Sequence, residues 1–476
     1  MAHESTKTSK EDLEKLLVPE KLEHCFECGI CTASCPVAKL ICKHYNPRIL
    51  LQTVSKDLET AITETQPWLC AWCDRCHERC PQGLNLPEIF LLTRNIAAER
   101  GYINRFREAV ETIGTEIPLP GVCGLVCFSK VDYPKAIKTL ERYVADYELK
   151  KKEKAVPASK KRREKIAVIG SGPAGLMAAY DLGRRGYRVT VFESLPEPGG
   201  MLRAGIPEFR LSRKVLDAEI ERIKGLGVEI KTNTTVGKDL TIDELLKDGY
   251  KAVFIATGAP KSQKLRVEGE ELKGVMHAID LLRQVNRGKK VKLGDKVAVI
   301  GGGNVAIDAA RAVLRLGAKE VTILYRRSRE EMPANPWEVR HGEKEGVKLQ
   351  FLVAPKRIIS KDGRLAAIEC VRMELGEPDE SGRRRPIPIK DSEFTIPLDT
   401  MILAIGEAPD TSFLPKGIEV TSQNTITVDP ITLQTSLPGI FAGGDVVSGP
   451  ATVMEAIVAG RRAASSIDEY LTSGGS

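Results

Sequence analysis

The chain has 476 residues, of which 42% are hydrophobic and 28% charged, and its formal net charge is +7 at pH 7. This length exceeds what one hydrophobic core supports and predicts two or three domains. The composition is typical of a soluble globular protein, and the modest charge gives no indication of nucleic-acid binding. The sequence has no apolar run of about 18 residues and no apolar secretion signal near its N-terminus, so we expect a cytoplasmic protein without a membrane span.

The cysteines are concentrated in one part of the chain. There are 12 of them, and only Cys370 lies beyond Cys127. In a reducing compartment such a cluster indicates metal ligands more strongly than disulfides.

Two motifs share one spacing, Cys-x2-Cys-x2-Cys-x3-Cys-Pro, beginning at Cys25 and again at Cys70. This is the spacing of bacterial ferredoxins, in which the fourth cysteine of each motif binds the cluster of the other motif. Zinc is the alternative, but zinc ribbons use pairs of CxxC and not a run of four that ends in proline. We therefore predict two [4Fe–4S] clusters, the first bound by Cys25, Cys28, Cys31 and Cys80, and the second bound by Cys70, Cys73, Cys76 and Cys35.

Residues 23–100 resemble the iron–sulfur subunits of heterodisulfide reductases and of succinate-dehydrogenase-type complexes. A long spacer, residues 44–67, separates the two motifs, and the segment Tyr45-Asn46-Pro47-Arg48 follows the first motif, as in that group. Of the cysteines up to Cys127, three lie outside the two motifs. We interpret Cys42 as a buried thiol, and whether Cys123 and Cys127 help to bind a cluster is left open.

A first nucleotide-binding fingerprint follows the apolar segment 166–169. It reads Gly170-Ser-Gly172-Pro-Ala-Gly175, and a second apolar segment, 188–192, ends at Glu193. In such a strand–turn–helix unit the glycines admit a pyrophosphate at the helix N-terminus, and the carboxylate binds ribose hydroxyls.

A second fingerprint, Gly301-Gly302-Gly303-Asn304-Val305-Ala306, repeats the arrangement. No carboxylate ends its second strand, where Arg326 and Arg327 stand instead. Guanidinium groups bind phosphate in a bidentate manner, so this site favours NADPH over NADH; the alternative is a solvated strand end.

Residues 121–466 resemble the glutamate synthase small (β) subunit family. The resemblance rests on segments 136–146, 200–207 and 325–333 and on Gly443-Gly444-Asp445. It implies that the first nucleotide is FAD. The residues then expected at FAD are Gly170, Gly172, Pro173, Ala174, Gly175, Glu193, Gly200, Met201, Thr257, Gly258, Gly444, Asp445 and Thr452, and those at NADPH are Gly301, Gly303, Asn304, Val305, Arg326, Arg327 and Gly406.

We expect an α/β fold with two Rossmann-like three-layer domains behind a mostly helical bis-[4Fe–4S] domain. The expected boundaries are 1–110 for the ferredoxin-like domain, 111–165 for a connector and basic linker, 166–288 plus 400–470 for FAD, and 289–399 for NADPH.

The expected function is that of an electron-transfer subunit in a multi-subunit oxidoreductase. Electrons would pass between NADPH and a partner through FAD and the two clusters, and bifurcation at the FAD is part of this hypothesis. Hydride transfer itself needs no catalytic protein side chain. The expected partner is a hydrogenase, formate dehydrogenase or heterodisulfide-reductase-type subunit, with ferredoxin as a further candidate; the alternative is the small subunit of a glutamate synthase. A disulfide reductase is disfavoured because Cys370 is the only cysteine in the flavoprotein half.

Overall fold

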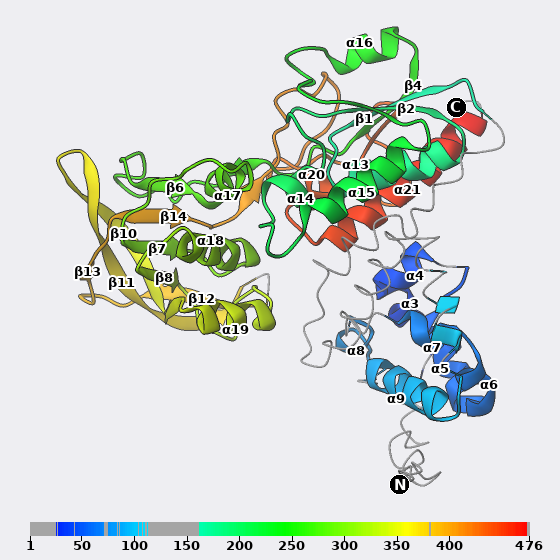
Figure 1. Ribbon diagram of the computed structural model, residues 1–476, viewed down its shortest axis with the longest axis horizontal. Coiled ribbons are helices and arrows are strands. Elements are labelled where there is room, and N and C mark those ends of the chain that lie inside the picture. Colours follow the sequence, from blue (N-terminus) through cyan, green and yellow to red (C-terminus); the bar gives the residue numbers. More distant parts are fainter. Residues whose placement is uncertain are drawn as a thin grey trace. The chain divides into compact units, whose positions relative to one another are not determined.

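The computed structural model describes residues 25, 27–41, 43–70, 75–82, 84, 86–102, 104–106, 108–109, 112, 161–379 and 382–473. These residues form two compact units, one cysteine-rich and helical, the other built on sheets (Figure 1). Cys42, Cys73, Cys123 and Cys127, the helical stretch expected over 133–147 and most of the basic linker lie outside the described residues.

The described part of the cysteine-rich unit is helical. Its elements are α3 (Ile30–Ser34), α4 (Pro36–Leu40), α5 (Pro47–Lys56), α6 (Leu58–Thr63), α7 (Gln66–Leu69), α8 (Arg75–Glu78) and α9 (Leu86–Glu99). Asn46 starts α5, because its side chain accepts hydrogen bonds from the backbone N–H groups of Arg48 and Ile49 and Pro47 suits the first helical position. Helix α9 contacts α5, α6 and α7, and it buries Ile96 and Ala97 against Ile62 of α6.

The first sheet of the larger unit is fully parallel, in the order β16-β4-β1-β2-β3. Its strands are β1 (Lys165–Ile169), β2 (Arg188–Phe192), β3 (Glu229–Lys231), β4 (Tyr250–Ile255) and β16 (Ile440–Ala442). Helix α13 (Pro173–Arg184) packs on β1, β2 and α15 (Arg213–Lys224), and α16 (Ile242–Lys247) packs on β4. Strand β1 is buried from Ile166 to Ile169, as expected for a sheet covered on both faces.

The second sheet is also parallel, in the order β6-β14-β7-β8-β9. Its strands are β6 (Val275–His277), β7 (Lys296–Ile300), β8 (Glu320–Tyr325), β9 (Lys348–Phe351) and β14 (Thr400–Leu403), and its helices are α17 (Ala278–Asn286), α18 (Asn304–Arg315) and α19 (Pro336–Glu345). Strand β14 pairs with β7 on one side and β6 on the other. Segments 275–286 and 400–403, which the expected boundaries placed with the first sheet, therefore belong to the second.

A smaller antiparallel sheet was not foreseen from the sequence. It consists of β10 (Val353–Lys361), β11 (Arg364–Pro378), β12 (Arg384–Pro388) and β13 (Phe394–Pro397), with β11 paired to the other three. Asp362 and Gly363, both with positive φ, make the tight turn between β10 and β11. An Asp-Gly pair between apolar runs is a strong hairpin signal, so the sequence did contain an indication of this sheet.

Buried charged side chains connect the segment after α14 with the helices of the second sheet. Arg210, which follows α14 (Met201–Ala204), pairs with Asp308 of α18 and approaches Glu338 of α19, its Nε lying 3.3 Å from Oε1. Burial raises the pKa of Asp308 to about 6, and Arg210 opposes that rise. The amide of Asn286 also donates to the carbonyl of Ala204 at 3.0 Å. These contacts fix the segment after α14 against the helices of the second sheet.

Candidate nucleotide-binding and iron–sulfur sites

The first glycine-rich turn requires glycine for steric reasons. Gly170 has φ +99°, and a Cβ there would lie 2.5 Å from the carbonyl oxygen of Ala256. A Cβ on Gly175 would lie 2.0 Å from the carbonyl oxygen of Gly170. In the described structure no heavy atom lies within 4 Å of a Cβ built on Gly172, the residue that caps α13. Strand, turn and helix are thus held together while the helix N-terminus, with Pro173 and Ala174, stays open for an anion.

Glu193 is held next to this turn. Its side chain is buried, and its carboxylate accepts hydrogen bonds from the backbone N–H groups of Ser171 at 3.0 Å and Leu195 at 2.8 Å. The Ser171 hydroxyl also donates to Glu193 and accepts from the N–H of Gly199 at 2.9 Å. Sequence reasoning missed Ser171, which links the fingerprint, the end of β2 and the Gly199-Gly200 turn.

The other residues expected at FAD lie at loops and helix starts of the first sheet. Gly200 has φ +52°, and a Cβ there would lie 2.8 Å from Cα of Gly172; Met201 begins α14. Gly258 has φ +68°, and the Thr257 hydroxyl beside it is buried without a hydrogen-bond partner among the described residues. An orphaned buried hydroxyl and a glycine cradle suit a bound polar cofactor.

Two further expected residues begin helices. Gly444, with φ +75°, precedes α20 (Asp445–Ser448), so Asp445 is its first residue. Thr452 forms a capping box with Glu455 at the start of α21 (Val453–Thr472), its hydroxyl accepting from the Glu455 N–H at 3.2 Å.

The second glycine-rich turn also requires glycine for steric reasons. A Cβ on Gly301 would lie 2.1 Å from the carbonyl oxygen of Ala404, and a Cβ on Gly302 would meet the Tyr325 ring at 2.4 Å. Gly303 caps α18, and no heavy atom of the described structure lies within 4 Å of its Cβ position. Asn304 and Val305 open α18, and the Asn304 side chain accepts from the N–H of Asn335 at 2.9 Å. Gly406, with φ +120°, lies three residues after the end of β14, and a Cβ there would lie 3.5 Å from the Gln263 side chain.

The structure separates the two arginines at the end of β8. The buried Arg327 donates to the carbonyl of Arg384 at 2.8 Å and pairs with Asp379 at 2.6 Å, which ties β8 to the β11–β12 hairpin. Arg326 is exposed, and none of the described carboxylates forms an ion pair with it. Although the side chain is exposed, its guanidinium has lost part of its hydration, and this loss together with the neighbouring Arg327 lowers the pKa of Arg326; Arg383 adds to the effect. Arg326 is therefore the guanidinium that remains available to a ligand.

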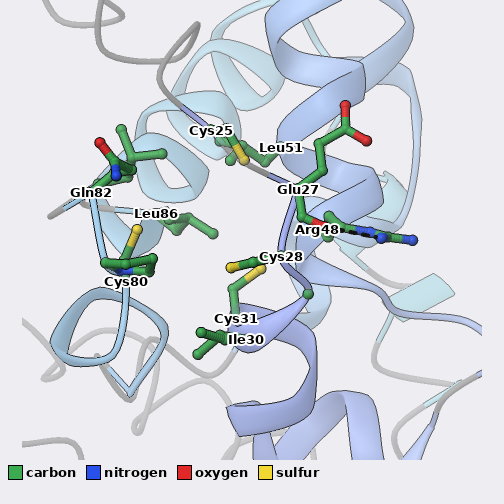
Figure 2. Close-up of a pocket in the computed structure, with 13 residues that line it drawn as sticks. Cys25, Glu27, Cys28, Ile30, Cys31, Arg48, Leu51, Cys80, Gln82 and Leu86 are labelled. Carbon is green, nitrogen blue, oxygen red and sulfur yellow. Dashed lines mark hydrogen bonds between the residues drawn. The ribbon is translucent and has the colours of Figure 1, made fainter.

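The first cysteine group surrounds a pocket. Cys25, Cys28 and Cys31 line it together with Cys80 from the second motif (Figure 2). Burial raises the pKa of Cys31, and Cys25 and Cys28 contribute to the rise because nearby thiolates repel one another. The structure thus places Cys80, the fourth cysteine of the second motif, beside the first three cysteines of the first motif. Arg48 also lines the pocket and donates to the Glu27 carbonyl at 3.3 Å.

The second cysteine group lies around Tyr45. This side chain is 2% exposed, and Cys70, Cys35 and Cys76 lie close enough to its hydroxyl to act on its pKa. Burial raises the pKa of Tyr45 well above its ordinary value, and Cys70 and Cys35 add to it. Cys35 of the first motif thus lies with the second group, whose remaining member Cys73 is outside the described residues.

No three His, Cys, Asp or Glu side chains of the described residues are close enough to bind one metal ion. A cubane differs from a mononuclear site because each of its four thiolates binds a different iron. The two cysteine groups fit that wider ligand set, with four members in the first and three described members in the second.

Cys370 takes no part in either group. It is fully buried in β11, and burial raises the pKa of its thiol to about 12. We expect Cys370 to resist maleimide in the native protein at pH 8, because the thiolate is the nucleophile. Peptide mapping by mass spectrometry checks this, with labelling in urea as the positive control. Labelling in native protein at the rate of an exposed thiol would contradict it.

Two open glycine-rich turns on parallel sheets, in one chain with two cysteine groups, are the features that define the class of this protein. The family model for pyridine nucleotide-disulphide oxidoreductases matches residues 164–460, and that for 4Fe–4S dicluster domains matches residues 21–84. NADPH-bound FprA of Mycobacterium tuberculosis superposes with a TM-score of 0.56 at 21% identity, over 66% of this chain and 85% of FprA, which shows the fold. In the part of the chain that is described, none of the helices has the length and apolar character needed to cross a membrane.

Curated relatives narrow this class. The NADP(+)-dependent formate dehydrogenase subunit beta of Moorella thermoacetica is 47% identical over 84% of this chain, which spans 60% of that subunit's length. The glutamate synthase [NADPH] small chain of Escherichia coli is 36% identical over 83% of this chain and 88% of its own. The chain belongs to the pyridine nucleotide-disulphide oxidoreductase family, in the group that contains the glutamate synthase small chain. The expected family, fold class and oxidoreductase assignment are thereby confirmed.

Proposed function

We propose that the protein is an electron-transfer subunit that passes electrons between NADPH and a partner through FAD and two [4Fe–4S] clusters. The observation that carries this proposal is the combination of two open dinucleotide turns with two cysteine groups that exchange their fourth cysteine. The match to a 4Fe–4S dicluster domain supports the two clusters.

The first glycine turn suits FAD. The open N-terminus of α13 would bind the pyrophosphate, Glu193 would meet the ribose, and the free Thr257 hydroxyl would find a partner on the cofactor. When bound, FAD would supply the conversion between two-electron hydride transfer and one-electron transfer to a cluster. The protein's residues position the cofactors; none of the described side chains is assigned as an acid or base for that step.

The second turn suits NADPH, with Arg326 as the phosphate ligand. We expect Arg326→Gln to raise KM for NADPH by about tenfold to 100-fold and to leave NADH oxidation nearly unchanged, because charge-assisted hydrogen bonds contribute roughly 1.5–3 kcal/mol. Steady-state kinetics with both nucleotides checks this. Arg329→Gln is the control, since Arg329 is exposed and pairs with Glu343.

Arg327→Gln is expected to act differently. Its guanidinium holds the hairpin through Asp379 and the Arg384 carbonyl, so we expect a lower melting temperature and a smaller change in nucleotide preference. If Arg327→Gln changed the preference and Arg326→Gln did not, the assignment of the phosphate ligand would be wrong.

For the partner we propose a formate dehydrogenase catalytic subunit, because the relative at 47% identity is named as a formate dehydrogenase subunit. The second candidate is a glutamate synthase large subunit, supported by the relative at 36% identity. A hydrogenase and a heterodisulfide-reductase-type subunit are the remaining candidates, and we include bifurcation at the FAD in the proposal. Anaerobic purification of the native complex tests the choice: co-purifying formate:NADP activity supports the first candidate, and glutamine-dependent glutamate formation supports the second.

A further inference from the structure

Arg94 of α9 is a buried cation at the second cysteine group. The residue is 7% exposed. Its guanidinium donates through Nε to the carbonyl of Pro67 at 2.6 Å and through Nη2 to the carbonyl of Cys70. Arg94 therefore fixes the chain that leads into the second motif, and it places a positive charge next to the first cysteine of that motif.

Among the described residues no carboxylate forms an ion pair with Arg94, whose hydrogen bonds go to backbone carbonyls. Burying an unpaired charge is costly, and buried charges in proteins are normally paired or placed at a metal site. An anionic group next to Cys70 would remove this cost.

Tyr45 is a second polar residue near the same cysteine. It precedes α5, is 2% exposed, and its hydroxyl lies within interaction range of the Cys70 thiol. A cluster-bound sulfur has no proton to donate, so in the loaded protein the hydroxyl would be the donor. Cys70 thus has a buried hydroxyl near its sulfur and a cation at its carbonyl.

We propose that Arg94 and Tyr45 are positioning residues for the second cluster: Arg94 is its counter-ion, and together they raise its reduction potential. The inference rests on the proposed cluster content. The cluster with its four thiolates is anionic, and its negative charge increases by one when it accepts an electron from the flavin. A fixed cation and a hydrogen bond to sulfur therefore stabilise the reduced form more than the oxidised form.

The first cysteine group differs from the second in how far its neighbouring arginine is buried. Its arginine, Arg48, is only partly buried and donates to the carbonyl of Glu27, which is itself exposed. Solvent screens a charge at such a position far more than one in the interior. The effect of Arg94 should therefore appear at one cluster and not at both.

The test is an EPR-monitored redox titration of the 476-residue chain, reconstituted anaerobically. We expect Arg94→Gln to shift the reduction equilibrium of one cluster about tenfold toward the oxidised form, a potential lower by about 59 mV for one electron. Arg94→Lys should retain most of the parent's potential. Arg100→Gln is the control, because Arg100 lies just beyond the same helix, is 44% exposed and pairs with Glu59.

Tyr45→Phe is the second variant, with Tyr102→Phe as its control. We expect the Tyr45 variant to lower the potential of the same cluster, even if Arg94→Gln fails to hold it. Full iron content with unchanged potentials in both Arg94→Gln and Tyr45→Phe would overturn the inference, as would equal shifts at both clusters. A parent chain that binds no clusters would instead contradict the proposed function, so the two failures are distinguishable.

Discussion

Replacing Cys80 by serine is expected to abolish the cluster bound by Cys25, Cys28 and Cys31, although Cys80 lies in the other motif. The structure places Cys80 at the pocket of those three cysteines. Serine is a poor ligand for a cubane, so iron should fall from about eight atoms per chain to about four. The same loss is expected for Cys35→Ser, but at the cluster of Cys70 and Cys76. Iron and sulfide analysis with EPR of the remaining cluster measures both effects.

Paired variants make this prediction decisive. The spectrum of Cys80→Ser should match that of Cys28→Ser, and the spectrum of Cys35→Ser should match that of Cys76→Ser. Cys370→Ser is the control and should keep the full iron content, because Cys370 lies in β11. If Cys80→Ser instead resembled Cys76→Ser, each motif would hold its own cluster and the exchange of ligands would be wrong.

Gly175→Ala is expected to lower bound FAD at least tenfold. The new methyl group would lie 2.0 Å from the carbonyl oxygen of Gly170, so α13 must move away from the turn that should bind the pyrophosphate. Overpacking of this kind costs about 1–3 kcal/mol of folding stability. Flavin released per chain and the melting temperature are the measurements.

Gly342→Ala provides the matched control for this substitution. Gly342 lies in α19, where a Cβ would make ordinary contacts of 3.6 Å or more, and alanine favours a helix. This variant should keep its flavin and its stability. Normal FAD content in Gly175→Ala would show that the first turn does not bind the cofactor as proposed.

Local patterns in the sequence were sufficient for the parallel sheets. The fingerprint at Gly170 predicted β1, the turn and α13, and the strand expected over 188–192 is β2 itself. These elements depend on residues close in sequence, through apolar runs and glycines with fixed spacing. The membership of β6 and β14 could not be read in this way, because pairing with β7 is a long-range property.

The site residues divide along the same line. Motif cysteines and glycines were visible because their spacing is chemical information, whereas the roles of Arg94, Tyr45 and Ser171 depend on tertiary contacts that no spacing predicts. Arg94 resembles any helical arginine until its burial and its bonds to the Pro67 and Cys70 carbonyls are known. The two arginines after β8 were predicted to act alike, and only tertiary contacts distinguish Arg326 from Arg327.

The most direct test of the account is an anaerobic titration of the purified chain with NADPH, followed by flavin absorbance and by EPR of the clusters. The account predicts that NADPH bleaches the flavin and that both clusters then become reduced, by NADPH or by a stronger donor added after it. Full reduction takes about four electrons per chain from the two donors together, since FAD takes two electrons and each cluster one. NADH at the same concentration should act far more slowly. A flavin that stays oxidised with NADPH would contradict the proposed electron path. Clusters that stay oxidised after the flavin is reduced and the stronger donor has been added would also contradict it.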